Sequence, residues 1–263
     1  HLADATDKAP YIDLAYFDRD GISCALNCYM AKAFEDAAAV MRVLGDADRA
    51  AAYDREAAAI ADAVRCEFWD DELKLFVDRL RRDDPDTEPS VHANTLPVLY
   101  GIATDEQAAA AVPFVADRLL HNFRVPEPEK NRECNVTSYF SFHPLQVLCG
   151  HGRSEAAESF IRAYWGRYLE MGAVNTWEYF VPICSLCHAW STSPVHFLAH
   201  EVLGVNFPEP GNPDKIRIRP ASTSLEWAKG VYPHPRGPIR VAWKKQNGVM
   251  QLSYDVPDGV SVE

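Results

Sequence analysis

The sequence predicts a mainly α fold in which helices pair antiparallel along residues 1–205, followed by a small antiparallel β-sandwich unit in residues 206–263. Three observations predict it. Apolar and small residues recur at helical spacing over most of the first part. Turns of a few residues separate some of these helices, which makes neighbours antiparallel. After Gly204, prolines separate short runs of alternating apolar and polar residues, as between β-strands.

The first predicted helix runs from Gly21 to Leu44 and closes at Gly45, a residue type that favours the left-handed conformation after a helix. A second helix spans 48–67, after a short turn at Asp46. Further helices are predicted at 89–101, 104–121, 136–150, 153–169 and 188–203, with Gly101, Gly150 and Gly204 as candidate C-caps. Helices that end in aromatic clusters before a loop favour an α-hairpin toroid, and no fixed-period repeat supports a solenoid.

The strands are predicted from alternation and turn residues. In the run 215–220, Ile216 and Ile218 alternate with arginines, which places one face of the strand on a core. Asn247-Gly248 separates the runs 239–245 and 249–254, and this dipeptide is a strong signal for a two-residue β-hairpin.

Composition limits the kinds of ligand. A formal net charge of -12 argues against a nucleic-acid partner, because phosphate binding needs clustered Lys and Arg, and a neutral ligand fits better. No run reaches the ~18 apolar residues of a membrane span, so no membrane partner is expected. The cysteines are odd in number, which favours free thiols in the cytoplasm over a periplasmic or secreted location. Cys184 and Cys187 form a C-x-x-C without a second pair, so we expect neither a metal nor a cofactor.

A series of motifs points to one family. In chain order they are Thr176-Trp177-Glu178, Ser185-Leu186-Cys187-His188, Ile216-Arg217-Ile218-Arg219-Pro220 and Pro235-Arg236-Gly237 followed by Trp243. With them the chain resembles glycoside hydrolase family 78, the bacterial α-L-rhamnosidases. In that family a T-x-W-E segment near the end of an (α/α)6 barrel carries a catalytic carboxylate, an S-x-x-H helix lines the pocket, and a C-terminal β-sandwich opens with an I-R-I-x-P strand. Asp13 lies in a segment that resembles the family's Gly-Asp-Trp, although Leu14 replaces the Trp.

The resemblance implies the second part of an (α/α)6 barrel and an inverting hydrolysis that releases terminal α-L-rhamnose from glycans or glycosides. An inverting reaction needs two carboxyl groups roughly 6.5–9.5 Å apart, an acid for the leaving oxygen and a base for water. Glu178 is the implied base. Trp177 and Tyr179 beside it are expected to form an apolar wall that excludes bulk water. The plainer interpretation of Glu178 is an ordinary carboxylate paired with an arginine.

Other side chains are candidates for contacts with the sugar. His188 is expected to donate a hydrogen bond to a sugar hydroxyl or to Glu178, Trp190 to stack on the apolar face of the sugar, and Asp13 to bind a sugar hydroxyl. Trp165 is a further stacking candidate. Tryptophans, however, more often pack in the core than offer a surface for a sugar ring. His188 equally fits a structural histidine packed beside Trp190. For His92, His143 and Glu133, near predicted loop ends, the structural interpretation is favoured over a place in the pocket.

The general acid is expected outside the given sequence. In family 78 it precedes the Gly-Asp-Trp segment, and no such segment precedes Asp13. About seven helices can be counted, whereas the barrel needs twelve. We therefore expect a fragment whose partners are a carbohydrate substrate and the missing N-terminal part of the same protein, or another copy of the chain. Two alternatives stay open: a non-catalytic carbohydrate-binding or scaffold fragment, and a different (α/α)6 glycosidase or lyase.

Overall fold

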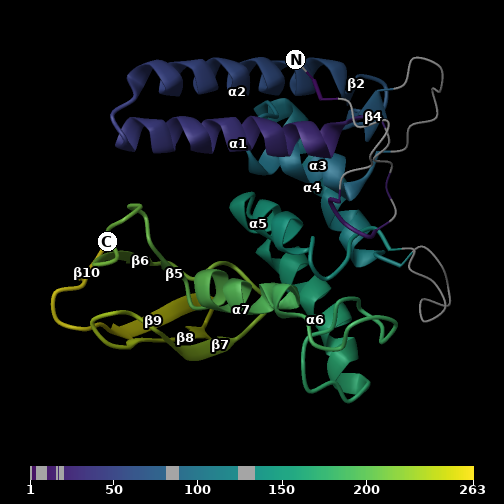
Figure 1. The fold of residues 1–263 in the computed structure, drawn as a ribbon. Coiled ribbons are helices and arrows are strands. Elements are labelled where there is room, and N and C mark those ends of the chain that lie inside the picture. The colour runs from purple at the N-terminus through teal and green to yellow at the C-terminus, as the bar shows by residue number, and fades with distance from the viewer. Residues whose placement is uncertain (1, 4–10, 16, 18–20, 81–88, 124–133) are drawn as a thin grey trace.

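A computed structural model describes residues 2–3, 11–15, 17, 21–80, 89–123 and 134–263 of the chain. Its helices pair along the chain and lead into a β unit at the C-terminus (Figure 1). The helices are α1 (Cys24–Val43), α2 (Ala47–Glu67), α3 (Val91–Leu99), α4 (Asp105–Leu120), α5 (Phe142–Gly150), α6 (Ser154–Glu170) and α7 (Ser193–Phe197). The predicted mainly α class is confirmed.

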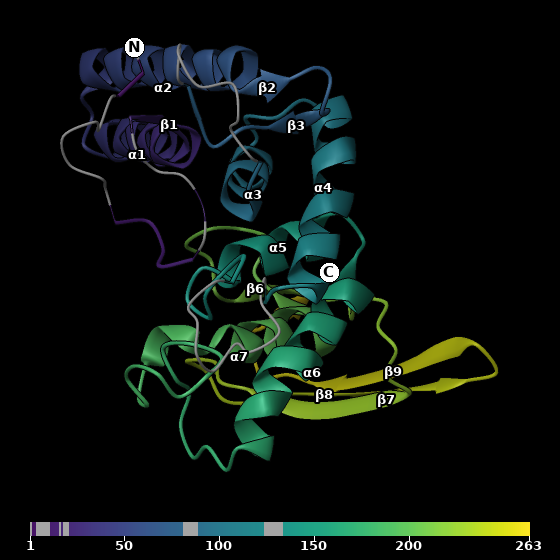
Figure 2. The ribbon, with the colours of Figure 1, turned by 90° about the vertical axis from the view of Figure 1, so that its right-hand side faces the viewer.

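The helices form two layers. α1 packs against α2, α3 against α4, and α5 against α6, so each pair is a hairpin. α1 also contacts α3, and α3 contacts α5, which makes these three one row, while α4 and α6 contact each other alongside it (Figure 2). The sequence explains the division, because α3 is apolar and buried along most of its length, whereas α2 buries few of its residues. This arrangement is the predicted part of an α-hairpin barrel.

Capping residues fix where the helices begin and end. The side chains of Ser23, Asp46 and Ser90 accept hydrogen bonds from the first turns of α1, α2 and α3. Thr104 forms a capping box with Gln107 at the start of α4. Gly45 has the predicted positive φ, 78°, and turns the chain from α1 into α2.

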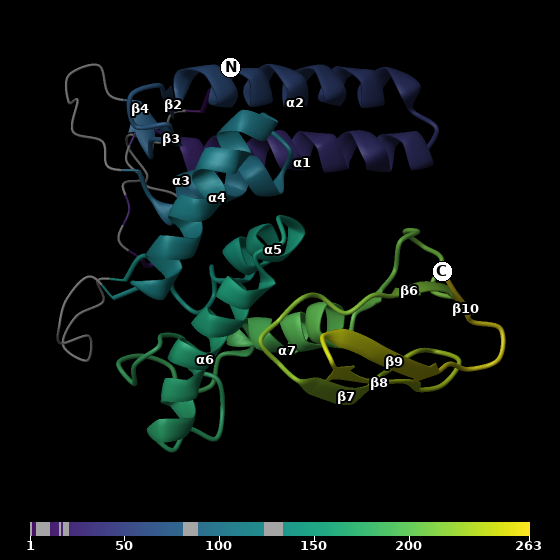
Figure 3. The ribbon, with the colours of Figure 1, turned by 180° about the vertical axis from the view of Figure 1, so that it is seen from behind.

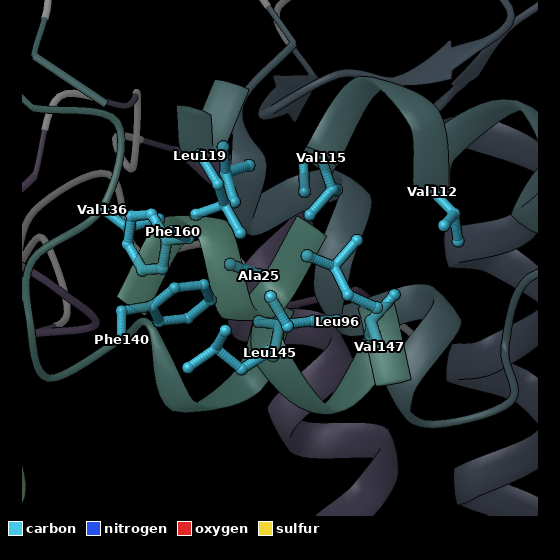
Figure 4. Close-up of a cluster of buried hydrophobic side chains, with 14 of the residues drawn as sticks. Ala25, Leu96, Val112, Val115, Leu119, Val136, Phe140, Leu145, Val147 and Phe160 are labelled. Carbon is cyan, nitrogen blue, oxygen red and sulfur yellow. The ribbon is translucent and has the colours of Figure 1, made fainter. Parts of the chain in front are cut away.

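One apolar cluster runs through the helical pairs. Figure 4 shows side chains from α3, α4, α5 and α6 meeting in its centre, together with Val136 and Phe140 from the segment before α5. Trp243, from the β unit, belongs to the same cluster and donates a hydrogen bond from its Nε1 to the carbonyl of Val202 at 2.7 Å. The helices and the β unit therefore share part of one core.

The β unit contains two small sheets that face each other. One has the order β10 (Ser261–Val262), β6 (Lys215–Ile218), β5 (Val205–Asn206), and the other β7 (Trp227–Tyr232), β8 (Ile239–Gln246), β9 (Val249–Asp255) (Figure 3). Ile216 and Ile218 pack against Ile239 and Val241 between them, as the alternation predicts. The pairing of β10 with β6 is parallel, a departure from the all-antiparallel expectation. The proposed boundary between 205 and 206 falls inside β5.

The predicted hairpin is confirmed. β8 and β9 pair antiparallel around Asn247 and Gly248, with Gln246 opposite Val249. Both turn residues have positive φ, 52° and 77°, as a two-residue hairpin of type I′ requires. Four short strands form two further antiparallel pairs among the described residues: β1 (Ile22–Ser23) with β4 (Arg79–Leu80), and β2 (Trp69–Asp70) with β3 (Leu75–Phe76).

Three predictions about the helices were wrong. The predicted helix 188–203 is divided into a 3₁₀ turn η2 (Ala189–Ser191), α7 and a π-helical turn η3 (Leu198–Val202), because Pro194 favours the first turn of a helix. The predicted helix 136–150 begins at Phe142, since the preceding residues are held by tertiary hydrogen bonds. The left-handed residue after α5 is Gly152, with φ 70°, and not Gly150.

Two observations bear on the expectations about a membrane partner and about the cysteines. Among the described residues, no helix has both the length and the apolar character needed to cross a membrane. The seven cysteines are free thiols in this structure. Glu133 lies outside the described residues.

Candidate functional site

The segment that contains Glu178 pairs with the segment that contains His188. The backbone N–H of Glu178 donates to the carbonyl of Ser185 at 2.9 Å, and that of His188 donates to the carbonyl of Thr176 at 2.8 Å. The Thr176 hydroxyl also donates to the carbonyl of His188 at 2.8 Å. Residues 185–188 therefore form one arm of an irregular hairpin between α6 and α7, and not the helix expected from the S-x-x-H resemblance.

Glu178 presents its carboxylate at the surface beside His188. Its side chain is 22% exposed, as is that of His188, and Oε2 lies 3.9 Å from Nδ1 of His188. The backbone N–H of Ser185 donates to the same Oε2 at 3.2 Å. The carboxylate is thus held on one oxygen while it keeps access to solvent, as a base that acts on a water molecule requires.

Trp177 and Tyr179 point the other way. Both are buried, whereas Glu178 between them is partly exposed, and such alternation is typical of extended backbone. The ring of Trp177 packs on that of Tyr168, with centroids 5.1 Å apart. The structure places these two predicted site residues in the core beneath Glu178, so their expected role as a wall around the carboxylate stays a prediction.

Trp190 is the exposed aromatic side chain of the site. It is 45% exposed, and its ring lies 4.3 Å from that of His188 and 5.0 Å from that of Tyr139. Glu178, His188, Trp190 and Tyr139 thus follow one another along the surface. Trp165, by contrast, is buried and donates a hydrogen bond to the carbonyl of Ser191.

Asp13 lies in the core, apart from the partly exposed carboxylate of Glu178. Its side chain is fully buried, with Oδ2 2.9 Å from Nε2 of His92. Oδ1 accepts a hydrogen bond from the hydroxyl of Thr137 at 2.5 Å, and Oδ2 accepts one from the Thr137 backbone N–H at 3.2 Å. In this structure the Asp13 carboxylate faces protein groups, so the binding of a sugar hydroxyl by Asp13 stays a prediction that its burial does not favour.

The histidines near Asp13 pack against aromatic side chains, as the structural interpretation expects, and that interpretation stays a prediction. His92 is fully buried between the rings of Phe17 and Phe140, with centroids 3.9 and 4.0 Å away. His143 stacks on Phe140 at 4.9 Å, and its burial lowers its pKa below the usual range. The neutral ring is therefore favoured in the folded protein.

The sequence did not reveal the hydroxyl groups behind Glu178. Ser138 and Tyr168 contact the backbone of residues 177–179 from the turn before α5 and from α6. Serine and tyrosine at these positions carry no spacing pattern, since the contacts join distant parts of the chain. Tyr139 was missed for the same reason.

A groove lies beside the site, and Trp190 lines part of it. It has a volume of about 830 Å³ between α7 and β7, and it is lined on its apolar walls by Trp190, Val195, Leu198, Trp227 and Val231. The described residues that line it include no carboxylate. Two histidines, His196 and His200, also line it.

The described residues offer no group of three or more His, Cys, Asp or Glu side chains that could hold a metal ion. Cys184 and Cys187 lie on either side of Ser185 and Leu186, in the arm that pairs with the Glu178 segment, and both are free thiols. The chemistry that the site supports is transfer of a proton between Glu178 and a water molecule or a sugar hydroxyl.

Comparisons with known proteins agree with this fold. The family model of the mannosylglycerate hydrolase MGH1-like glycoside hydrolase domain matches residues 9–133, and that of the bacterial alpha-L-rhamnosidase C-terminal domain matches residues 204–263. A search of curated proteins finds no match.

Solved structures resemble nearly the whole chain. A GH78 family rhamnosidase of Bacillus sp. GL1 is 26% identical, with a TM-score of 0.81, over 99% of this chain and 28% of that chain. An alpha-L-rhamnosidase from Dictyoglumus thermophilum is 19% identical, with a TM-score of 0.72, over 89% and 26%. The Streptomyces avermitilis alpha-L-rhamnosidase complexed with L-rhamnose is 18% identical, with a TM-score of 0.69, over 90% and 22%. The chain thus spans about a quarter of the length of these structures.

In its helical hairpins and in the family models that match it, the chain resembles the class of glycoside hydrolases. Within that class the chain is rhamnosidase-like, and the resemblance to family 78 predicted from the sequence is confirmed.

Proposed function

We propose that the chain forms part of an inverting glycoside hydrolase that releases terminal α-L-rhamnose from glycans or glycosides, with Glu178 as the general base. The observation that carries the proposal is the partly exposed Glu178 carboxylate, held by the N–H of Ser185 beside His188 on a segment whose neighbouring side chains are buried. The structural likeness to a GH78 family rhamnosidase supports the same substrate class.

In the proposed mechanism, Glu178 removes a proton from a water molecule as that water attacks the anomeric carbon of the sugar. A general acid on the other face protonates the leaving oxygen, and we expect it in a part of the enzyme outside this sequence. His188 lies close enough to Glu178 to share a hydrogen bond after a small side-chain movement, or to bind a sugar hydroxyl. Trp190 offers a ring for the apolar C–H face and the methyl group of rhamnose.

The mechanism is tested in the full-length enzyme with Glu178→Gln. The amide cannot accept the proton, so kcat should fall by about 10²–10⁴-fold while the fold is kept. Glu170→Gln, an exposed carboxylate at the end of α6, is the matched control and should leave kcat unchanged. Retention of activity by Glu178→Gln would rule out this assignment. Proton NMR of the first product formed tests the inverted configuration.

A second candidate function is hydrolysis of another sugar by the same fold. The match of residues 9–133 to a mannosylglycerate hydrolase-like domain favours it. A panel of aryl α-L-rhamnoside and α-D-mannoside substrates separates the two candidates. Faster hydrolysis of the rhamnoside supports the first, and faster hydrolysis of the mannoside supports the second. A non-catalytic binding or scaffold protein would cleave neither substrate.

A further inference from the structure

We propose that the hydroxyl groups of Ser138 and Tyr168 are positioning groups for Glu178, because together they hold the backbone carbonyls of Trp177, Glu178 and Tyr179. This inference rests on the proposed function of Glu178 as the base. It assigns no contact with substrate to either hydroxyl.

The two side chains converge on consecutive peptide groups. The Ser138 hydroxyl lies 2.6 Å from the carbonyl oxygen of Glu178 and 3.1 Å from that of Trp177. The Tyr168 hydroxyl lies 3.1 Å from the carbonyl oxygen of Trp177 and 3.0 Å from that of Tyr179. Each hydroxyl carries one proton, so each donates to one of its two carbonyls at a time.

Both hydroxyls are available as donors at all working pH values. Ser138 is fully buried and Tyr168 nearly so. Burial raises the pKa of Tyr168 to about 12, partly opposed by a hydrogen bond with Ser138, so the phenol stays protonated. A buried carbonyl that loses its donor costs free energy, which makes these contacts hard to replace by water.

The donors are anchored independently of the segment that they hold. Ser138 follows Thr137, whose backbone and hydroxyl are fixed by the buried Asp13, and its own hydroxyl lies 2.7 Å from that of Ser191. Tyr168 is on α6. Residues 177–184 form neither helix nor strand, so these anchors supply the rigidity that regular structure would otherwise give.

The position of the backbone sets the position of the carboxylate. Displacement of a catalytic group by about 1 Å costs on the order of 10²-fold in rate. Loss of one hydroxyl should therefore lower kcat and leave substrate binding nearly intact, because neither hydroxyl reaches the surface beside Trp190.

The test compares Tyr168→Phe and Ser138→Ala with Tyr164→Phe in the full-length enzyme. Tyr164 is a matched control: it is a buried tyrosine of the same helix whose hydroxyl bonds to the backbone of Asn122 and Leu120 instead. We expect kcat to fall about 10–100-fold in Tyr168→Phe and Ser138→Ala, with KM changed by less than about twofold. Tyr164→Phe should be destabilised to a similar extent and keep its kcat.

A second measurement isolates the action through Glu178. In Glu178→Ala, azide can replace the activated water as nucleophile and form a glycosyl azide while the aglycone leaves. Adding Tyr168→Phe to Glu178→Ala should leave this azide-dependent rate unchanged, since no carboxylate remains to be positioned.

Three outcomes would overturn the inference: an unchanged kcat in Tyr168→Phe, an equal loss in Tyr164→Phe, or a fall in the azide-dependent rate on adding Tyr168→Phe. Ser138→Cys, which keeps a weak donor, should recover part of the activity lost in Ser138→Ala, and no recovery counts against the hydroxyl. Failure of the proposed function itself is recognised separately, because Glu178→Gln would then remain active.

Discussion

Removal of the Glu158 carboxylate should destabilise the protein in a pH-dependent way, because this group joins α6 to the β unit. Glu158 is 5% exposed and accepts hydrogen bonds from the backbone N–H of Ser224 at 2.8 Å and from its hydroxyl at 2.7 Å. Nε of Arg162 donates to the same carboxylate at 2.8 Å.

The expected magnitude follows from these three contacts. Hydrogen bonds to a charged group contribute about 1.5–3 kcal/mol each, part of which offsets the cost of burying the carboxylate. The Arg162 pair adds at most about 0.5 kcal/mol, because the arginine side chain is 62% exposed. Glu158→Ala should therefore lower the free energy of unfolding by about 2–3 kcal/mol at pH 7.

The sign of the pH dependence follows from the pKa of Glu158. Burial alone would raise this pKa, but the hydrogen bonds from Ser224 and Arg162 outweigh burial and lower it. A lowered folded-state pKa means that the carboxylate stabilises the fold above its unfolded pKa of about 4.3. This contribution is lost as the pH falls from there through the folded-state pKa.

Urea unfolding at pH 7 and near pH 3.5 measures both effects. The difference between the natural protein and Glu158→Ala should shrink at the lower pH. Glu170→Ala, an exposed carboxylate on the same helix, should stay within about 0.5 kcal/mol of the natural protein at pH 7. The reasoning is refuted if Glu158→Ala costs no more than Glu170→Ala, or if its cost is the same at both pH values.

Two further predictions concern the β junction and the site. Gly204→Ala should cost about 3–5 kcal/mol in urea unfolding, because Gly204 has φ +79° and an added Cβ would lie 2.2 Å from the backbone nitrogen of Pro220. Gly211→Ala, at φ +80° but in open space, should cost about 1 kcal/mol, and equal costs would contradict the steric argument. Trp190→Ala should raise KM about 3–10-fold through loss of the sugar platform, whereas Trp227→Ala, also exposed, should not.

Local signals predicted many of the elements. Gly45 marks the end of α1, and Asn247-Gly248 marks the β8–β9 hairpin, because each of these positions needs a positive φ that few residue types adopt readily. Such requirements are set within a few residues of the chain. They are therefore visible in the sequence without knowledge of the fold.

The failures arose where distant contacts override local preference. Residues 136–141 were predicted as helix. The backbone N–H of Val136 instead donates to the side chain of Asn122, and that of Thr137 donates to Asp13, so α5 starts later. Pro144 in the first turn of α5 and Pro194 in that of α7 were available signals for these later starts.

The candidate site divides in the same way. The resemblance to family 78 implied the roles of Glu178 and His188, and the structure brings the two side chains together. The buried environments of Asp13, Trp177 and Tyr179 were not apparent, since burial depends on which segments pack over a residue. The hydroxyls of Ser138 and Tyr168 required the structure for the same reason.

The place of Trp243 in the helical cluster has a consequence for the ancestry and engineering of such enzymes. The indole N–H of Trp243, in the β unit, donates to the carbonyl of Val202, in the turn that follows α7. The hydrogen bond therefore needs one group from each side of the junction. A recombinant that joined the helices of one relative to the strands of another would keep a main-chain carbonyl at position 202, but the indole N–H would reach it only if the two parts packed as they do here, and otherwise would be buried without an acceptor. Crossovers between relatives should therefore survive most readily where both partners of this contact are inherited together.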